Sequence, residues 1–495
     1  MLALNSNFIN GELKKSFSGA FTVKSPFTPY SFELPNSSSV DMSFALSCAT
    51  KARERVASLS FDERCAILTK AAELYAVDDD EMHHIAQMTG MPIKYVRERV
   101  NFGKSILSSL PAMLRLRYGH KFDTITRELL RNGSDVLRVT GYETHRAADG
   151  IIAAFVPPND PAEIPFLFGH IVMYGGVAII KPSATEPYFS MKIAKLLTDA
   201  GYPAGALSVI HWDTSDATRN SVRAELVKCS SHRIIMGGKK TADMLLKVTD
   251  DDGNFVEEHY STGRNCIFSS GNSKAIVAEG CDVELVAELL VKGAYEWTRD
   301  CVTTKTVFVV GEQKHRLIHA VKKLLEEKSS RMGSILDEHT EIGSVEDAQR
   351  VVQTITGLID FKYATLHFGT LECRGNSYTP FLLETSQLHS PLLQQELPYT
   401  LTIVPVATFD DAIAAVNIAS QNLDDGMSMA VSVFSPHLTL DDFYRAMPES
   451  TKKLLTMKCH MLMYNKPSTM LNVYLRHQDM LLTEFLTHPL SINHD

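Results

Sequence analysis

The 495-residue sequence lacks several features that mark particular classes of protein. Its eight cysteines include no CxxC pair and have no His-rich neighbourhood, so the sequence predicts neither a metal site nor a disulfide framework. No run of Lys or Arg is long enough to follow a phosphate backbone, and the net charge is -9 at pH 7. We therefore expect small-molecule partners and no nucleic acid.

A long, uninterrupted apolar run is also missing. The longest apolar stretch, residues 164–180, contains His170 and the pair Gly175-Gly176, which favours a helix followed by a strand over a membrane span. The opening MLALNSNFINGELKK has neither the basic start nor the apolar centre of a signal peptide. Together with the unpaired cysteines, these absences predict a cytoplasmic protein with no membrane partner.

What is present is the composition of a globular protein, with 44% hydrophobic and 22% charged residues. The chain is too long for a single hydrophobic core, so we expect two or three packed units. Apolar residues recur at helical spacing over residues 40–116, whereas 151–156 and 177–180 are short apolar runs bounded by Gly and Pro. This alternation predicts a mostly parallel sheet covered by helices.

Residues 129–149 interrupt this pattern. The pair Asn132-Gly133 is a turn signal, and VLRV and TGYETH follow it. The sequence predicts a hairpin that lies outside the alternating core.

Two segments carry residue types that suggest chemistry. PPNDP, at residues 157–161, follows the predicted strand 151–156, and IIKPS follows at 179–183. Asn159 and Lys181 would then lie at strand ends, where α/β sheets bind ligands, although both could equally be ordinary loop residues. The second segment, YEWTRDCVTT at 295–304, places Cys301 between a predicted helix and a strand. Such a cysteine can face a cleft, but most cysteines are inert core residues.

The order of these and other pieces resembles the aldehyde dehydrogenase superfamily over residues 8–465. The pieces are FINGE at 8–12, PPNDP at 157–161, IKPS at 180–183, AGYPAG at 200–205, IMGG at 235–238, RDC at 299–301, ELPYT at 396–400, VPV at 404–406, DAI at 411–413 and YN at 464–465. They correspond to the family's FINGE, PWNFP, LKPS, AGLPxG, FTGS, GQxC, EIFGP, VxxF, EAI and YIN motifs.

The resemblance implies a role for each matching position. Cys301 would be the nucleophile, and the Asn159 amide with the Cys301 backbone N–H would form the oxyanion hole. NAD or NADP would be the hydride carrier, and a thioester on Cys301 would follow hydride loss. The implied cofactor-binding residues are Lys181, Ser183 and Ala184 on the adenosine side, Gly237 and Gly238 at the pyrophosphate, and Glu396 at the nicotinamide ribose.

The sequence departs from the family at the general base. Hydrolytic members carry a glutamate in an ELGG strand some thirty residues before the cysteine. The best local match here is YSTGRN at 260–265, which puts Tyr260 at the glutamate; a second alignment, on FSSG at 268–271, supplies no acid either. Glu257 or Glu258 could substitute if the alignment shifts, although adjacent acids are more often a solvated loop.

Further departures concern the cofactor and the tail. Ala184 stands where NAD-preferring members often keep a glutamate, and its loss favours NADP because it removes repulsion against a 2'-phosphate. Gly238 replaces the serine of FTGS, and Pro158 replaces a tryptophan. Past Asn465 the family's PFGGxKxSG loop is absent.

The expected fold is therefore α/β and aldehyde dehydrogenase-like. We predict a Rossmann-type dinucleotide-binding domain at 1–124 and 150–262, a catalytic domain at 263–460, and a β oligomerisation element at 125–149 and 461–495 that makes a homodimer or homotetramer. The favoured function is NAD(P)-dependent aldehyde oxidation. A CoA-acylating dehydrogenase or acyl-CoA reductase, with coenzyme A as co-substrate, is one alternative, and a catalytically silent binding protein is the other.

Overall fold

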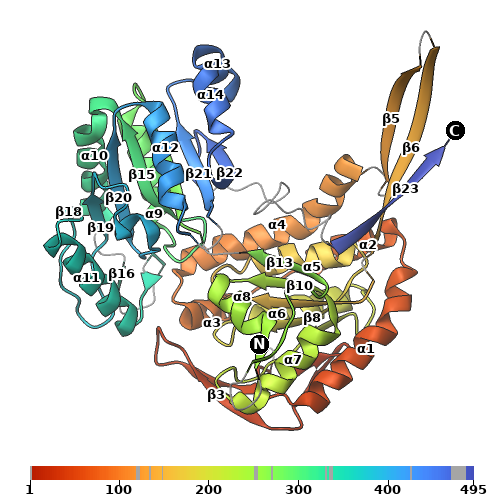
Figure 1. Ribbon diagram of the computed structural model, residues 1–495. Helices are drawn as coiled ribbons and strands as arrows, with labels where there is room; N and C mark the ends of the chain where they lie inside the picture. The colour runs from red at the N-terminus through yellow and green to blue at the C-terminus, as the bar shows by residue number, and fades with distance from the viewer. Residues whose placement is uncertain are drawn as a thin grey trace.

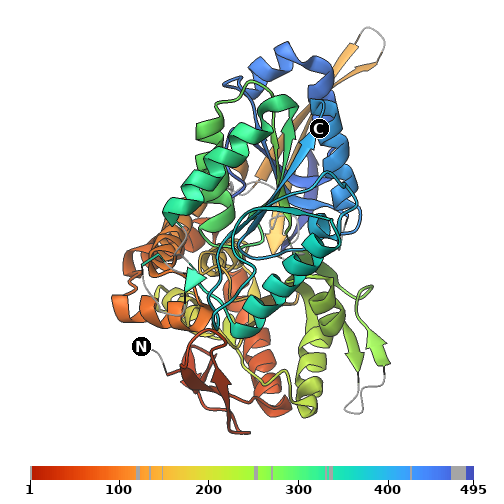
Figure 2. The ribbon, with the colours of Figure 1, turned by 90° about the vertical axis from the view of Figure 1, so that its left-hand side faces the viewer.

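The computed structural model has two α/β lobes and a narrow β arm that projects from the first of them (Figure 1 and Figure 2). The structure describes residues 3–118, 123–132, 135–147, 149–249, 255–268, 271–328, 332–333, 338–339, 341–423, 426–469 and 486–494. Gly133, Ser269, Ser270 and residues 470–485, which include most of the tail that departs from the family, lie outside the described residues.

The first lobe is built on a mainly parallel sheet. In the described part of the chain its strand order is β13-β10-β7-β8-β9-β1-β2, and only β1 and β2 run antiparallel to their neighbours. β7 and β8 are buried along their whole length because helices cover both faces of the sheet. The strands are β1 (Asn7–Ile9), β2 (Glu12–Lys14), β7 (Ile151–Val156), β8 (Val177–Pro182), β9 (Leu207–Val209), β10 (Ser230–Met236) and β13 (Arg264–Phe268).

These strands confirm the ones predicted at 151–156 and 177–180, and the second extends to Pro182. The helical segment predicted at 40–116 forms four consecutive helices. Three of them start with a capping box, in which Ser38 pairs with Asp41, Ser60 with Glu63 and Asp78 with Glu81. The helices of the first lobe are α1 (Ser39–Ala57), α2 (Phe61–Leu74), α3 (Asp79–Thr89), α4 (Ile93–Tyr118), α5 (Glu163–Met173), α6 (Tyr188–Asp199), η1 (Ala217–Arg219), α7 (Asn220–Cys229) and α8 (Lys239–Leu246).

The second lobe has its own sheet and its own hydrophobic core. Among the described residues its strand order is β18-β19-β20-β15-β14-β21-β22, with β18 alone antiparallel. The strands are β14 (Ser273–Val277), β15 (Thr304–Val310), β18 (Thr365–Phe368), β19 (Phe381–Glu384), β20 (Thr400–Val406), β21 (Ser428–Phe434) and β22 (Cys459–Tyr464). The helices are α9 (Val283–Tyr295), η2 (Gly311–Gln313), α10 (Lys314–Lys328), α11 (Val345–Asp360), η3 (Pro391–Gln394), α12 (Phe409–Ser420), α13 (Leu440–Ala446) and α14 (Pro448–Leu454).

The arm confirms the predicted hairpin. β5 (Asp123–Asn132) and β6 (Asp135–Ala147) pair antiparallel up to Asn132 and Asp135, which flank the predicted turn. The C-terminal strand β23 (Thr487–His494) pairs antiparallel with β6 and completes a three-stranded sheet. Short two-stranded ribbons complete the described fold: β3 (Ala20–Lys24) with β4 (Ser31–Pro35), β11 (Lys247–Thr249) with β12 (Phe255–Glu258), and β16 (Met332–Gly333) with β17 (Glu341–Ile342).

The α/β architecture is thus as expected, whereas the domain limits stay a prediction. The first sheet extends to Phe268, past the predicted boundary at residue 262, and β22 keeps residues up to Tyr464 in the second sheet. In the described part of the chain, none of the helices combines the length and the apolar character needed to cross a bilayer.

Candidate active site

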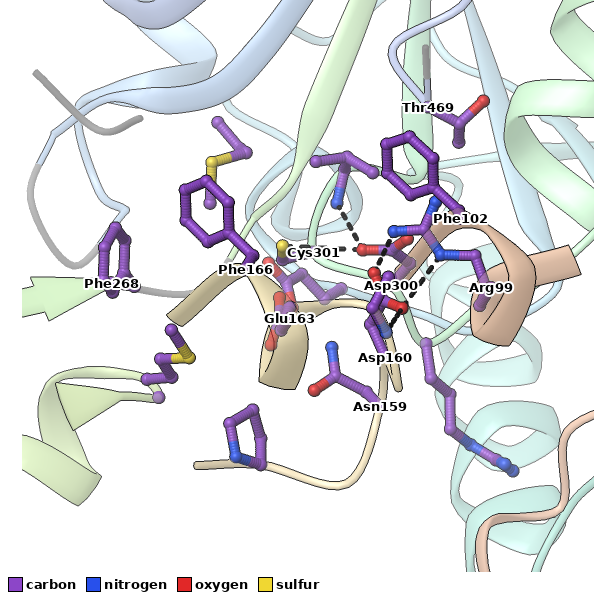
Figure 3. Close-up of a pocket in the computed structure, with 18 of the residues that line it drawn as sticks. Arg99, Phe102, Asn159, Asp160, Glu163, Phe166, Phe268, Asp300, Cys301 and Thr469 are labelled. Carbon is purple, nitrogen blue, oxygen red and sulfur yellow. Dashed lines mark hydrogen bonds and ion pairs between the residues drawn. The ribbon is translucent and has the colours of Figure 1, made fainter. Parts of the chain in front are cut away.

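A cavity of about 500 Å³ lies between the two lobes, and it contains most of the predicted site (Figure 3). Cys301, Asn159, Gly237, Gly238 and Glu396 all line it. The remaining three predicted residues, Lys181, Ser183 and Ala184, line a second cavity of about 410 Å³. Pro157, Met236 and Gly237 belong to the walls of both cavities, so the two form one continuous groove along the carboxyl ends of the first sheet.

Cys301 lies in the loop between α9 and β15, where it is partly exposed to the cavity. Its thiol donates to Asp300 Oδ1, with the sulfur 3.6 Å from that oxygen. Burial raises the pKa of the Cys301 thiol well above its ordinary value, and the negative charges of Asp300, Glu163 and Glu396 raise it further. These surroundings hold the sulfur in its neutral form.

Asn159 reaches the same cavity from the turn after β7. The Trp297 indole N–H donates to the Asn159 backbone carbonyl over 2.8 Å, and this bond ties the turn to the cysteine loop. The Asn159 side-chain Oδ1 is buried and has no hydrogen-bond partner among the described residues. An amide in this position can donate its N–H groups toward an oxygen that forms beside the sulfur.

A charged cluster that sequence reasoning missed forms one wall of the cavity. Arg99 from α4 holds the Asp160 carboxylate with two hydrogen bonds, of which the one from Nε is 2.9 Å long. Tyr95 donates to Asp300 Oδ2 at 3.1 Å, and Glu163 stands at the start of α5. Asp160 and Asp300 are the sequence neighbours of Asn159 and Cys301, so they belong to segments that the sequence singled out. No local pattern points to Arg99 or Glu163.

The structure decides between the two alignments of the missing base. Phe268, at the end of β13, lines the cavity, and Figure 3 shows it on the far side of Phe166 from Cys301. Tyr260 does not line this cavity, and its hydroxyl donates to Asp243 Oδ1 at 2.6 Å. The preferred match at 260–265 was therefore wrong. The second alignment, on residues 268–271, places an apolar ring where hydrolytic relatives carry the acid.

Glu257 and Glu258 do not replace that acid. Both lie on the exposed ribbon strand β12, away from the cavity wall. Glu257 pairs with His259 at 3.5 Å. They are an exposed, solvated pair on that strand.

The second cavity is lined by basic groups, Lys181 and Arg223 among them, and by the acids Asp213 and Asp216. Lys181 Nζ donates to the Pro182 carbonyl at 2.8 Å and lies 5.2 Å from the centre of the Trp212 ring. Burial lowers the pKa of Lys181 to about 8. Arg223 from α7 was not predicted, although it lines this cavity, is 9% exposed, and has no hydrogen-bond partner for Nε and Nη2 among the described residues.

The N-terminus of α8 opens onto the junction of the two cavities. Gly238 is its N-cap, and no side chain of the described residues caps the helix. A Cβ atom at Gly237 would lie 3.1 Å from the Thr241 side chain, so a larger residue at this position would leave less room for a ligand to approach the helix start. Unsatisfied N–H groups at such a helix start favour phosphate. Together with the unpaired Arg223, they fit a dinucleotide.

Comparisons with known proteins point to one family. The family model described as "Aldehyde dehydrogenase family" matches residues 14–431. An aldehyde-dehydrogenase-like protein of Sinorhizobium fredii is 25% identical, over 78% of this chain and 72% of its own. Malonate-semialdehyde dehydrogenase of Halalkalibacterium halodurans is 22% identical, over 83% of this chain and 82% of its own.

Solved structures show the same fold. The NAD-dependent benzaldehyde dehydrogenase of Corynebacterium glutamicum superimposes with a TM-score of 0.78 at 16% identity, covering 100% of this chain and 99% of its own. The NADP-dependent glyceraldehyde-3-phosphate dehydrogenase of Bacillus halodurans, complexed with NADP, gives 0.77 at 18% identity and covers 99% of each chain. Since the family model matches most of its length, the chain belongs to the aldehyde dehydrogenase family.

Proposed function

We propose that this protein is an NAD(P)-dependent oxidoreductase that oxidises an aldehyde through a thioester on Cys301. The observation that carries the proposal is the shared cavity, in which Cys301, the Asn159 amide and the open start of α8 face one space. A nucleophile, an oxyanion donor and a phosphate-binding helix end are the parts that this reaction needs.

The chain's own residues account for the first bond-forming step. The Cys301 sulfur adds to the aldehyde carbon and passes its proton to a neighbouring carboxylate, of which Asp300 is already its hydrogen-bond acceptor. The Asn159 amide and the Cys301 backbone N–H donate to the oxygen that becomes negative. A bound nicotinamide ring supplies the hydride acceptor, and Cys301 then carries an acyl group.

NADP fits the adenosine cavity better than NAD does. Ala184 removes the carboxylate that NAD-preferring members often keep at this position, and Lys181 and Arg223 add basic groups to a cavity whose wall also carries Asp213 and Asp216. A buried guanidinium without a partner is costly, and a bound phosphate would satisfy it. Calorimetric titration of the protein with NADP+ and with NAD+ tests this directly, and we expect tighter binding of NADP+.

The activity itself is tested with purified protein, either nucleotide and a panel of aldehydes, read at the nicotinamide absorbance. Malonate semialdehyde, benzaldehyde and glyceraldehyde 3-phosphate, which the names of the relatives suggest, belong in the panel. Reduction that Cys301→Ser abolishes supports the proposal. Turnover that appears only with added coenzyme A would instead show the acylating alternative, and no reduction with any aldehyde would show a silent relative.

The protein should act as a homodimer or homotetramer joined through the arm. The sheet of β5, β6 and β23 stands away from the first lobe (Figure 1), so its faces are available to a second copy.

A further inference from the structure

The cavity around Cys301 contains a carboxylate that has no assigned task. An acyl group on Cys301 has to be released, and Phe268 cannot activate water at the position where the family's acid stands. The cavity wall holds four acids, Asp160, Glu163, Asp300 and Glu396. The question is which of them can take a proton from a water molecule beside the sulfur.

Two of these acids are already engaged. Arg99 holds both oxygens of Asp160, and Asp160 Oδ1 also accepts from the Ala162 N–H at 2.8 Å. Asp300 accepts from the Tyr95 hydroxyl and from the Cys301 thiol. Asp160 is therefore fixed in the wall, and Asp300 is the acceptor of the thiol proton in the first step. Glu396 is an exposed residue in the turn that precedes β20.

Glu163 differs from them in its surroundings. Its Oε2 is buried and has no hydrogen-bond partner among the described residues, and the side chain is only partly covered, on the cavity wall. Figure 3 shows it between Cys301 and Asn159, the two residues that would flank the acyl carbon. Its charge is near enough to the sulfur to raise the pKa of the thiol.

The position of Glu163 is fixed by its helix. It is the first residue of α5, and its N–H donates to the Asp160 carbonyl at 3.2 Å. Burial raises the pKa of Glu163 well above that of an ordinary carboxyl, and the charges of Asp160 and Asp300 add to the effect. A carboxylate with a raised pKa is a stronger base near neutral pH.

We propose that Glu163 is a catalytic residue, the general base that activates water to release the acyl group from Cys301. The inference rests on the proposed function, because it needs the acyl group on the sulfur. The water oxygen bonds to the acyl carbon while its proton passes to the Glu163 carboxylate. The carbon–sulfur bond then breaks, the acid leaves, and the proton held by Glu163 passes to the Cys301 sulfur, which regenerates the thiol and the carboxylate. Water is the only co-reactant.

The test separates acylation from release. Wild-type protein and Glu163→Gln are mixed rapidly with nucleotide and aldehyde, and the acyl group on Cys301 is measured by intact-protein mass spectrometry. We expect both proteins to form one equivalent of reduced nucleotide in the first turnover. Steady-state turnover of the variant should fall at least about 100-fold, and the acylated protein should accumulate.

Three controls make the result specific. Glu257→Gln removes a similar carboxylate from the exposed ribbon and should leave turnover unchanged. A small thiol added to Glu163→Gln should restore turnover, because it attacks the thioester without a base. Melting temperature and nucleotide binding of Glu163→Gln should match the wild type, and Glu163→Asp, which keeps the carboxylate, should recover part of the turnover.

Turnover of Glu163→Gln within about threefold of the wild type would overturn the role of Glu163 and leave the oxidoreductase intact. If turnover of the wild type requires coenzyme A, the acyl group is released without water, which also overturns the role of Glu163 and leaves the oxidoreductase intact. A wild-type protein that forms no acyl group on Cys301 would remove the proposed function, and the inference with it.

Discussion

Gly271 packs directly against the backbone of Cys301. A Cβ atom built on Gly271 would lie 1.6 Å from the Cys301 carbonyl oxygen and 2.9 Å from its Cα. No side chain fits between the two backbones, so a glycine at position 271 is needed for the Cys301 loop to keep this position.

We therefore expect Gly271→Ala to displace Cys301 and to slow acylation by about 100-fold, the cost of a misplacement of roughly 1 Å. Gly357→Ala is the matched control, because a Cβ atom at that position in α11 meets nothing within 4 Å. First-turnover reduction of the nucleotide measures the effect. Equal rates for the two variants would show that the loop absorbs the extra atom.

The Cys301 thiol should react slowly at neutral pH. Its raised pKa means that the reactive thiolate is scarce until the pH exceeds the ordinary thiol value near 9. Alkylation at this residue, followed by mass spectrometry over a pH series, should give a midpoint above 9. Asp300→Asn removes a negative charge and an acceptor beside the sulfur, so it should lower the midpoint and speed labelling at pH 8. A wild-type midpoint below 8 would contradict the environment described here.

Arg223→Gln should weaken NADP+ binding by about 10-fold to 100-fold, the range for a charge-assisted bond to phosphate, and should leave NAD+ binding nearly unchanged. Lys228→Gln, an exposed change on the same helix, is the control. Calorimetric titration gives both affinities. If Arg223→Gln lowers the affinity for NADP+ and for NAD+ equally, Arg223 does not contact the 2'-phosphate.

The Arg99–Asp160 pair should matter for stability. Asp160 is 5% and Arg99 23% exposed, so Asp160→Asn leaves a largely buried guanidinium without its partner. We expect a loss of about 3 kcal/mol in denaturant unfolding. Arg97→Gln breaks the exposed pair with Glu338, which is 2.9 Å long, and should cost less than about 1 kcal/mol. Similar losses of stability for Asp160→Asn and Arg97→Gln would mean that the Arg99–Asp160 pair is as accessible to water as the exposed pair.

Removal of residues 486–495 should reduce the protein to a monomer. β23 pairs with β6 from Thr487 to His494, so its loss removes one of the three strands of the sheet through which we propose that the copies join. Light scattering during size-exclusion chromatography measures the mass. If the truncated protein keeps the assembly of the full-length protein, the interface between copies does not depend on β23.

The sequence was sufficient for the features that depend on neighbours along the chain. Apolar runs identified β7 and β8, the turn pair identified the arm, and motif order brought Cys301 together with Asn159. It failed at Tyr260 because local similarity ignores strand pairing, and it is the pairing of β13 with β10 that brings Phe268 to the cavity.

Other residues could not be found from spacing. Arg99, Glu163 and Arg223 reach the groove from three helices that are far apart in the sequence. Each is an ordinary charged residue until its helix packs against a sheet. Their importance comes from burial and from missing or shared partners, which only the folded chain displays.

The short passage from β13, which ends at Phe268, to β14, which begins at Ser273, has a mechanical consequence. It joins the two sheets, and Gly271 within it contacts the Cys301 backbone. Whatever shifts Gly271 must therefore also shift the loop that carries the nucleophile, so the position of the sulfur depends on the same few residues that connect the two lobes.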